Sequence, residues 1–362
     1  MPQESYNKTI TFLLFGPILC PGGGIKIILE YANRLAKDGH KVNVVYPATL
    51  NWKKKNLKYK LKSIYHYFLH EQKGWKCKRW FNLDPRVKEI HSISLNYKDI
   101  PKSDIYIATE ARTAPYVAKY PVDKSHKFYF IQGFDNWNLT DEEVKATYRL
   151  PLTKIVIADW LRELVKEEKE ECYVVKNSFD FDYFKLYNPI KGRNSLTIGT
   201  LYHEAVGKDV KTTMKALSIV HNKYPDLQVL MFGTANAPEN LPKWYKYFQT
   251  PNQETHNWIY NNSAIFVGSS KQEGWGLTIG EAMICGAAVA CTDIQGYREM
   301  AKHEETALLS SVGDPQKLAA NIIRLIEDTD LREKLASNGN RFIQQFRWEK
   351  AYACLQKALR LI

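Results

Sequence analysis

Residues 273–283 read EGWGLTIGEAM, and this stretch decides the fold that the sequence predicts. An apolar run, Ala264–Val267, precedes it and predicts a buried strand, while the residues from Leu277 onward predict a helix. Gly274 and Gly276 allow a tight turn between the two and let the backbone approach a ligand closely. Main-chain amides at a helix N-terminus bind phosphate, so the amides of Leu277, Thr278 and Ile279 predict a site for a nucleotide diphosphate.

The same alternation of apolar runs and amphipathic stretches surrounds this turn on both sides. The second half of the chain predicts strands at 196–199, 228–232, 263–267 and 288–291, and helices at 210–224, 276–285, 315–327 and 331–346. The first half predicts a strand at 10–15, a glycine run at 22–24, a helix at 25–36 and strands at 42–46, 105–108, 127–131, 155–157 and 173–175. Strand, helix and strand in succession imply parallel pairing with right-handed crossovers. The expected fold is therefore α/β, with two Rossmann-like domains and ligands at the carboxyl ends of the strands.

Six segments, in chain order, resemble family 4 glycosyltransferases. EGWGLTIGEAMICG at 273–286 resembles the E-x7-E signature of that family, with Trp275 where Phe is usual. The other five are PGGG at 21–24, VVKNSFDFDYF at 174–184, TDIQGYRE at 292–299, GDP at 313–315 and FRW at 346–348. The resemblance covers nearly the whole chain and implies the GT-B fold, in which two Rossmann-like domains with parallel sheets face a cleft. It implies an acceptor-side domain at 1–190, a nucleotide-sugar domain at 191–345, and a C-terminal helix at 346–362 that returns to the first domain.

The resemblance also implies a donor site. In this family Glu281 would bind the donor ribose and Glu273 the hydroxyls of the donor sugar, while the glycine loop would close on the diphosphate. The donor-binding set is Gly22, Gly23, Gly24, His203, Gly274, Trp275, Gly276, Leu277, Thr278 and Glu281. From the residues alone, a solvated loop acid at 273 and an ordinary helix-start acid at 281 remain open alternatives.

The two expected catalytic residues are Glu273 and Lys208. Lys208 stands where the family places a lysine that neutralises the departing diphosphate, and cations act most strongly there as negative charge develops. The family's companion arginine is missing, because Tyr202 and His203 occupy that stretch. The resemblance implies no metal and no cofactor besides a UDP-, GDP- or dTDP-linked sugar donor. A plain surface lysine at 208 is the alternative.

Candidates for the acceptor side follow two predicted strands of the first half. Glu110 and Arg112 come after the strand at 105–108, and Gln132 comes after the strand at 127–131. A family histidine that often contacts the donor sugar is absent from this region. Each candidate is equally compatible with an ordinary polar loop residue.

Positive charge gathers in one short segment. The chain carries 51 Lys and Arg against 39 Asp and Glu, a net charge of +12, and residues 51–80 alone hold ten cations and one acid, interleaved with seven Trp, Tyr and Phe. Cations beside interfacial aromatic residues suit an anionic membrane surface and a lipid-linked acceptor. A solvated segment is the alternative, and no recognised nucleic-acid-binding module accompanies the charge, so we expect no nucleic-acid partner.

The sequence argues against a disulfide-bonded, a membrane-spanning or a metal-binding protein. The six cysteines are scattered without a C-x-x-C pair, so we expect reduced thiols and a cytoplasmic location, with peripheral contact at the inner face of the cell membrane as an option. No apolar run reaches the length of a membrane span. His66, His70 and Cys77 have metal-like spacing, but a basic aromatic segment is a poor metal site.

Two rival functions remain to be weighed. A non-catalytic nucleotide-sugar-binding subunit of a glycosylation complex is suggested by the missing arginine. A dinucleotide oxidoreductase is disfavoured, because PGGG lacks G-x-G-x-x-G spacing and Tyr46 and Pro47 stand where an acid is expected. The LYH stretch at 201–203 resembles bacterial deoxysugar transferases of rhamnose type, which favours an enzyme of cell-surface polysaccharide synthesis.

Overall fold

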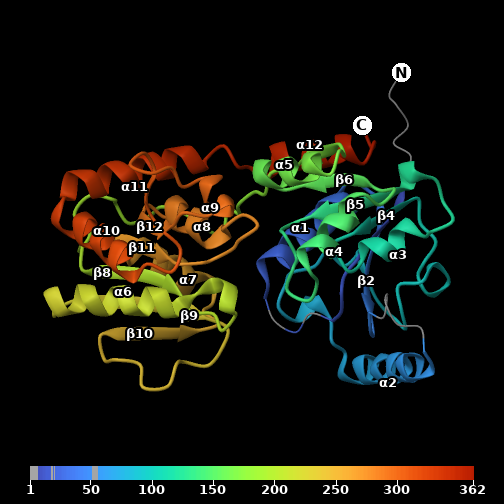
Figure 1. Ribbon diagram of the computed structural model, residues 1–362, viewed down its shortest axis with the longest axis horizontal. Coiled ribbons are helices and arrows are strands. Elements are labelled where there is room, and N and C mark those ends of the chain that lie inside the picture. The colour runs from blue at the N-terminus through green and yellow to red at the C-terminus, as the bar shows by residue number, and fades with distance from the viewer. Residues whose placement is uncertain (1–6, 18, 20, 51–55) are drawn as a thin grey trace. The chain divides into compact units, whose positions relative to one another are not determined.

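The computed structural model describes residues 7–17, 19, 21–50 and 56–362 of the chain (Figure 1). They form two compact units. The first contains Met1–Lys176 and Ala351–Ile362, and the second contains Asn177–Lys350. Among the described residues, no helix is both long enough and apolar enough to cross a membrane.

The first unit is built on a seven-stranded parallel sheet in the order β3-β2-β1-β4-β5-β6-β7. Its strands are β1 (Thr9–Leu13), β2 (Lys41–Pro47), β3 (Lys88–Ser92), β4 (Ile105–Ala108), β5 (Lys127–Ile131), β6 (Thr153–Val156) and β7 (Cys172–Val174). Its helices are α1 (Gly23–Lys37), α2 (Leu57–Lys73), α3 (Ala114–Ala118), α4 (Asp141–Tyr148), α5 (Asp159–Glu167) and most of α12 (Trp348–Ala358).

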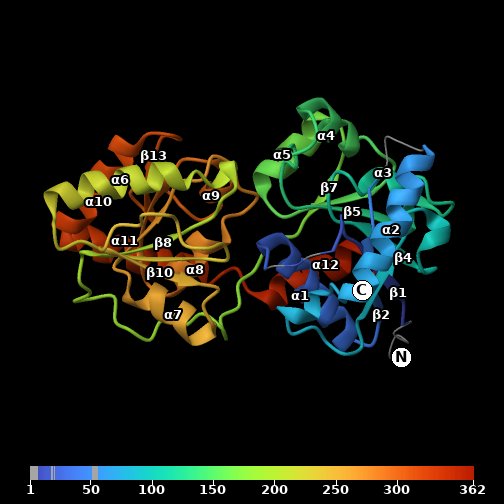
Figure 2. The same cartoon turned by 90° about the horizontal axis from the view of Figure 1, so that it is seen from below.

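The second unit is built on a six-stranded parallel sheet in the order β10-β9-β8-β11-β12-β13. Its strands are β8 (Thr197–Leu201), β9 (Gln228–Gly233), β10 (Tyr245–Gln249), β11 (Ile265–Gly268), β12 (Ala288–Thr292) and β13 (Ala307–Ser310). Its helices are α6 (Val210–Lys223), α7 (Gln253–Asn262), α8 (Leu277–Ile284), α9 (Gln295–Arg298), α10 (Pro315–Glu327) and α11 (Thr329–Ile343). Helices cover both faces of the sheet, with α6 beside α10 and α7 beside α8 (Figure 2). The prediction of an α/β fold with two parallel sheets is confirmed.

Both sheets reverse their strand order at one point, and this reversal locates the sites. In the first sheet the order turns between β1 and β4, where Phe12 pairs with Ile107. In the second it turns between β8 and β11, where Val267 pairs with Thr200. Ligands of open parallel sheets bind beyond the carboxyl ends of the strands at such a reversal. Each unit therefore has one favoured edge for binding.

The elements that sequence periodicity located best are those with strong apolar patterns. The predicted bounds of β4, β5 and α10 agree with the structure. The edge strands β3, β10 and β13 were not predicted: polar residues interrupt the apolar runs of β3 and β10, and the apolar run of β13 is only three residues long. Helix α11 begins earlier than predicted, since the side chain of Asp328 caps it by accepting from the Leu331 amide at 2.9 Å.

The segment 177–190, which we expected in the acceptor-side domain at 1–190, belongs to the second unit in the structure. The side-chain amide of Asn261, which is fully buried, explains this attachment. Its Oδ1 accepts from the Tyr187 amide at 3.0 Å and its Nδ2 donates to the Lys185 carbonyl at 2.8 Å. Buried Arg193 adds a second anchor, because its guanidinium donates to the carbonyls of Ser263 and Cys285, at the ends of α7 and α8.

The end of the chain joins the first unit. Tyr352 donates to Asp38 Oδ2 at 2.6 Å, and Gln356 donates to the same oxygen at 3.1 Å. Asp38 is the residue that closes α1, so α12 lies against the C-terminal end of that helix.

We predict that Asn261→Ala lowers the free energy of unfolding by about 2–4 kcal/mol, because it removes several hydrogen bonds and leaves buried main-chain groups unsatisfied. Urea denaturation measures the loss. Asn262→Ala is the matched control, since the neighbouring amide makes one bond, to the Trp258 carbonyl near the surface. Equal losses in the two variants would contradict the anchoring role of Asn261.

Candidate functional site

Two loops meet at the carboxyl edge of the second sheet. The first follows β8 and runs through a short 3-10 turn, Val206–Lys208, into α6. The second follows β11 and leads into α8. The amide of Lys271 donates to the carbonyl of Gly207 at 2.8 Å and ties the loops together. The strand reversal therefore brings residues 208 and 273 side by side although they are far apart in sequence.

Lys208 and Glu273 form an ion pair. Lys208 Nζ lies 2.6 Å from Glu273 Oε1, and the two side chains are 29% and 14% exposed. The hydroxyl of Ser270 donates to the same carboxylate oxygen at 2.8 Å, and Tyr297 donates to Ser270 at 2.9 Å. Because Lys208 and Ser270 both contact its carboxylate, Glu273 is not a freely solvated loop acid. Lys208 is likewise not an isolated surface residue.

The turn before α8 depends on a glycine. Gly276 has φ +93°, and a Cβ there would lie 2.5 Å from the ring of Tyr297. The side chain of Trp275 is 3% exposed and packs edge-on against Phe346 at 5.2 Å, so only its backbone is placed for a ligand.

One expectation for the helix amides needs correction. We counted Ile279 with Leu277 and Thr278 among the amides available to a phosphate at the start of α8. The Ile279 amide instead donates to the Gly276 carbonyl at 3.1 Å. The first amides of a helix have no intrahelical partner, so those of Leu277 and Thr278 are the ones left for an anion.

Glu281 is held by a hydrogen bond from Tyr260. The buried phenol donates to Glu281 Oε2 at 2.8 Å. Burial and the nearby charge of Glu281 raise the pKa of Tyr260 well above its usual value, so the phenol keeps its proton and remains a donor. The carboxylate is thereby oriented, as binding a pair of vicinal hydroxyls requires.

His203 is a poor replacement for the missing arginine. Its Nδ1 accepts from the Ala205 amide at 3.0 Å. Partial burial of the ring and the Lys208 ammonium lower the pKa of His203, so the ring is neutral at pH 7. Lys271 is a second cation near the site. Its Nζ lies 3.8 Å from Oδ2 of Asp209, the residue that follows Lys208.

In the first unit, the acceptor-side candidates Glu110 and Arg112 also form an ion pair, at 2.7 Å between Glu110 Oε1 and Arg112 Nε. The guanidinium of Arg112 lies over the ring of Phe15, 5.2 Å from its centre, beyond the end of β1. A second carboxyl joins them from the loop after β5, where Asp135 Oδ2 accepts from the Ala111 amide at 3.4 Å. Burial and the charge of Glu110 raise the pKa of Asp135 to about 7, and burial also raises the pKa of Glu110.

The glycine run and Gln132 meet in the first unit. Gly22 caps α1 with its backbone alone, and Gly23 and Gly24 form the exposed first turn. A Cβ on Gly24 would lie 3.3 Å from Gln132 Oε1, an oxygen that is buried without a hydrogen-bond partner among the described residues. We assigned the glycines to the donor and Gln132 to the acceptor, and the structure places them next to each other.

Several residues of these sites were missed by sequence reasoning. Ser270, Tyr297 and Tyr260 support the two glutamates, and Asp135 completes the charged cluster of the first unit. Of these, Ser270 and Asp135 could have been found, because each lies within a few residues of a predicted strand end.

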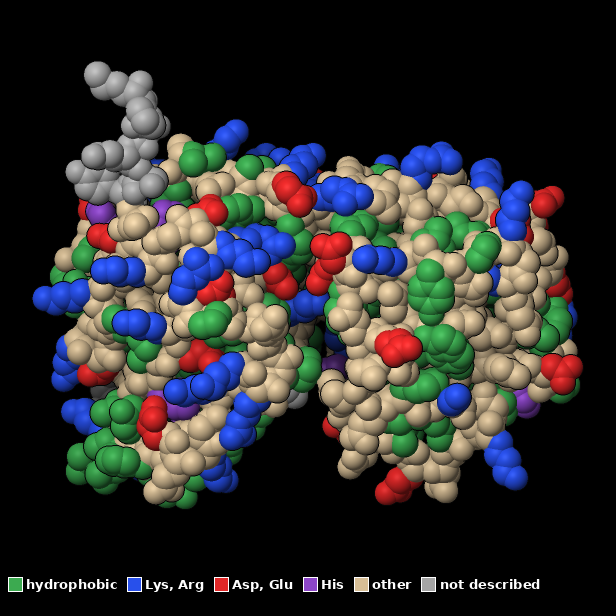
Figure 3. Space-filling view, turned by 180° about the vertical axis from the view of Figure 1, so that it is seen from behind, with side chains coloured by type: hydrophobic (Ala, Val, Ile, Leu, Met, Phe, Trp, Pro, Cys, Tyr) green, Lys and Arg blue, Asp and Glu red, His purple; other side chains and the backbone are tan. Residues whose placement is uncertain are grey.

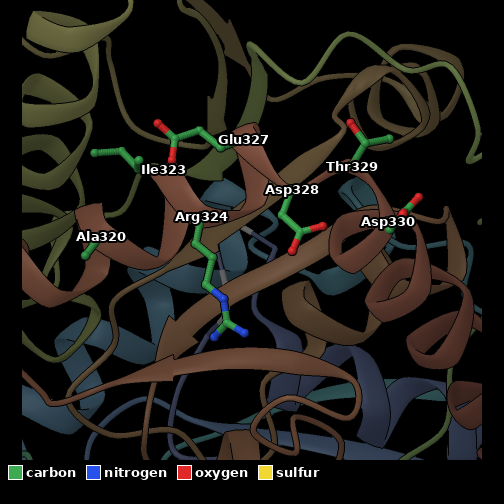
Figure 4. A pocket seen from close by; sticks show the side chains of 7 residues that line it. All are labelled: Ala320, Ile323, Arg324, Glu327, Asp328, Thr329 and Asp330. Atoms are coloured by element: carbon green, nitrogen blue, oxygen red, sulfur yellow. The ribbon is translucent and has the colours of Figure 1, made fainter.

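A hollow of about 640 Å³ lies elsewhere, between the end of α10 and the start of α11 (Figure 4). It is lined by side chains from residues 320–330, which include Arg324 and Glu327. Because α10 runs back from the carboxyl edge of the sheet, this hollow lies at the opposite edge from the Lys208–Glu273 pair. It shares no lining residue with the candidate site.

Metal ligands do not gather within the part of the chain that the structure describes: no group of three or more His, Cys, Asp or Glu is placed to hold an ion. His66 and His70 do contact each other, with ring centres 5.7 Å apart, but Cys77 lies by Glu89 and Tyr46.

Comparison with known proteins agrees with this geometry. Residues 182–342 match the family model of glycosyl transferases group 1. The capsular polysaccharide biosynthesis glycosyltransferase CapM of Staphylococcus aureus is 25% identical over 194 residues, which are 50% of each chain. The phosphatidyl-myo-inositol mannosyltransferase of Mycolicibacterium smegmatis is 21% identical over 363 residues, covering 93% of this chain and 89% of that protein. The chain spans about half the length, or less, of the first curated relatives that it matches.

Among solved structures, Anabaena HepE in complex with UDP-glucose aligns with a TM-score of 0.71 at 16% identity, covering 98% of this chain and 100% of that chain. The chain therefore has the GT-B fold, which consists of two Rossmann-like domains. The match to glycosyl transferases group 1 lies within the second unit, and the expected resemblance to glycosyltransferases is confirmed.

We predict that Asp135→Asn reduces the dependence of stability on pH. Because the pKa of Asp135 is raised in the folded state to about 7, the folded chain binds more protons than the unfolded chain between pH 4 and 7, and stability falls as pH rises through this range. The variant should gain on the order of 2 kcal/mol relative to the natural protein between pH 5 and 8.

Urea denaturation at a series of pH values measures this difference. Asp226→Asn, at an exposed turn of the second unit, is the control and should leave the pH profile unchanged. Parallel profiles for Asp135→Asn and the natural protein would show that the carboxyl is not buried against Glu110.

Proposed function

We propose that the protein is a retaining glycosyltransferase that moves a sugar from a nucleotide-diphosphate donor to a glycan or lipid-linked acceptor, in bacterial cell-surface polysaccharide synthesis. The Lys208–Glu273 pair beside the start of α8 is the observation that carries the proposal. It combines an ammonium and free helix amides for a diphosphate with a fixed carboxylate for a sugar.

The chemistry follows from this arrangement. As the bond between the sugar and the diphosphate breaks, positive charge develops on the sugar ring and negative charge on the departing phosphate. Lys208 and the amides of Leu277 and Thr278 stabilise the phosphate, and helix N-termini and ammonium groups act most strongly on a developing charge. Glu273 accepts hydrogen bonds from the donor sugar, and Glu281 accepts them from the ribose. No side-chain nucleophile is required.

The donor is a UDP-, GDP- or dTDP-linked sugar. Two facts support a nucleotide sugar: the structural neighbour HepE was solved in complex with UDP-glucose, and relatives named as mannosyltransferases align with 33% and 93% of this chain. Within the GT-B arrangement, Gly22, Gly23 and Gly24 would approach the diphosphate from the first unit. Lys271, with Lys208, supplies the charge that the missing arginine would have given.

The acceptor side is assigned to the charged cluster of the first unit. Glu110 and Asp135 offer oxygens to acceptor hydroxyls, Arg112 donates, and the ring of Phe15 provides an apolar face of the kind on which sugars stack. Gln132 brings a further oxygen, which has no hydrogen-bond partner within the described part of the chain. We place the enzyme on the cytoplasmic side of an anionic membrane, with residues 51–80 as the contacting region; residues 51–55, with Lys53, Lys54 and Lys55, lie outside the described residues.

A non-catalytic nucleotide-sugar-binding subunit is the second candidate. The absent arginine and the neutral His203 favour it, because both reduce the charge available to the leaving diphosphate. The two candidates share the donor site and differ in whether bound donor turns over.

We predict that one nucleotide diphosphate and its sugar raise the melting temperature of the purified protein in a thermal-shift panel of UDP-, GDP- and dTDP-linked compounds, because a ligand that binds only the folded state stabilises it. Slow hydrolysis of the same donor without acceptor should be detectable by release of the diphosphate. No shift with any compound would exclude both candidates, whereas binding without hydrolysis or transfer would favour the subunit.

We predict that Lys208→Met and Glu273→Gln each lower kcat/KM for that donor by about 10²–10³-fold, as expected for removing a group that stabilises developing charge. Lys211→Met is the control, because Lys211 is an exposed residue of α6 close to Lys208 in sequence. An activity loss in the control as large as that in Lys208→Met would point to general destabilisation instead.

A further inference from the structure

Helix α2 carries a row of exposed apolar side chains. Leu57, Leu61, Ile64, Tyr65 and Phe68 are 70%, 59%, 43%, 65% and 60% exposed. Their spacing of four, three, one and three residues places them on one face of an α-helix. We call these five residues the α2 stripe. Green side chains gather at the lower left of Figure 3, where α2 lies.

The opposite face of α2 holds it to the first unit. Ser63 and His70 are its buried residues. Ser63 bonds to Thr49, and the ring of His70 lies 5.1 Å from that of Trp75 and 5.9 Å from that of His91 on β3. Because these contacts lie across the helix from the stripe, they direct the apolar side chains away from the protein.

The surroundings of the stripe are strongly basic. Residues 56–80 contain seven Lys and Arg and one acid, Glu71. Lys58 and Lys62 flank one side of the stripe and Lys60 flanks the other, and all three are exposed. An apolar row between lysines matches the interface of an anionic bilayer, whose headgroups attract the cations while the acyl chains accept the apolar groups.

We propose that α2 lies in the surface of an anionic lipid membrane, with the α2 stripe inserted among the acyl chains and the flanking lysines on the headgroups. The inference deepens the proposed function, because membrane contact serves the proposed lipid-linked acceptor, but the binding itself needs no transfer reaction. The proposal differs from attraction by charge alone, because the cations of residues 51–80 would attract an anionic membrane even without the α2 stripe, whereas insertion requires the stripe.

Flotation of the full chain with lipid vesicles tests the proposal. We expect binding to vesicles that contain phosphatidylglycerol and little binding to vesicles of phosphatidylcholine alone. Part of the binding should persist at about 0.5 M salt, where exposed charges are screened over a few ångströms. The double substitution Leu61→Glu with Phe68→Glu should reduce the bound fraction at least about tenfold, since apolar insertion is replaced by repulsion from the headgroups.

Matched variants separate the alternatives. Ile362→Glu is the control for adding an acid at an exposed apolar residue, because Ile362 is 70% exposed outside α2. Replacement of Leu61 and Phe68 by Ser keeps the net charge and should also weaken binding. Circular dichroism and the melting temperature verify that each variant is folded.

Three results would overturn the proposal: no binding to any vesicle, binding that the stripe variants leave unchanged, or a stripe whose substitution alters oligomeric state instead of lipid binding. Donor thermal shift in the same variants is read separately and should not change. If the natural protein binds no donor, the proposed function is refuted. If it binds donor but no vesicles, only this inference is refuted.

Discussion

The pairing of β8 with β11 at the reversal of strand order is the constraint on which the candidate site depends. Parallel strands that are neighbours across a reversal send their following loops to the same edge of the sheet, on opposite faces, and leave a gap between them. In this chain the gap is bounded by the Lys208 turn and the Gly274–Gly276 turn, joined by the bond from Lys271 to Gly207. The side chains of the site are therefore positioned by loops that are anchored at the ends of β8 and β11.

Both units place their candidate sites at a reversal of strand order, but the charges at the two sites differ. In the second unit a cation and an acid face each other, and hydroxyl groups from Ser270 and Tyr260 orient the two glutamates. In the first unit two carboxyls lie near one arginine; burial raises the pKa of both carboxyls, and the charge of Glu110 raises the pKa of Asp135 further. The charges of the second unit suit a diphosphate, and those of the first unit suit a neutral ligand with several hydroxyl groups.

Sequence reasoning succeeded where a local pattern is tied to a local structure. The apolar runs of β4, β5 and α10 and the glycine turn before α8 could be read directly, because periodicity and backbone freedom act over a few residues. The ion pair between residues 208 and 273 was not predicted: family resemblance assigned both residues to the donor site, but no local signal joins positions so far apart. The position of Asp135 just after a predicted strand was visible in the sequence, but its raised pKa was not, because that depends on the burial and charge that the fold creates around it. The same holds for α2: its cations were evident in the sequence, but the direction of its apolar side chains required the buried Ser63 and His70.

The attachment of α12 to Asp38 has a consequence for dissecting the molecule. The first unit is not one continuous stretch of the gene, because its last helix is encoded after the whole of the second unit. A protein that stops at Lys176 would lack the partners of Asp38 and expose the surface of α1 that α12 covers. An intact first unit would instead require circular permutation, with Ala351–Ile362 rejoined through a linker to the residues that precede β1. In the order of the chain, the second unit is therefore an insert between the two segments that form the first unit.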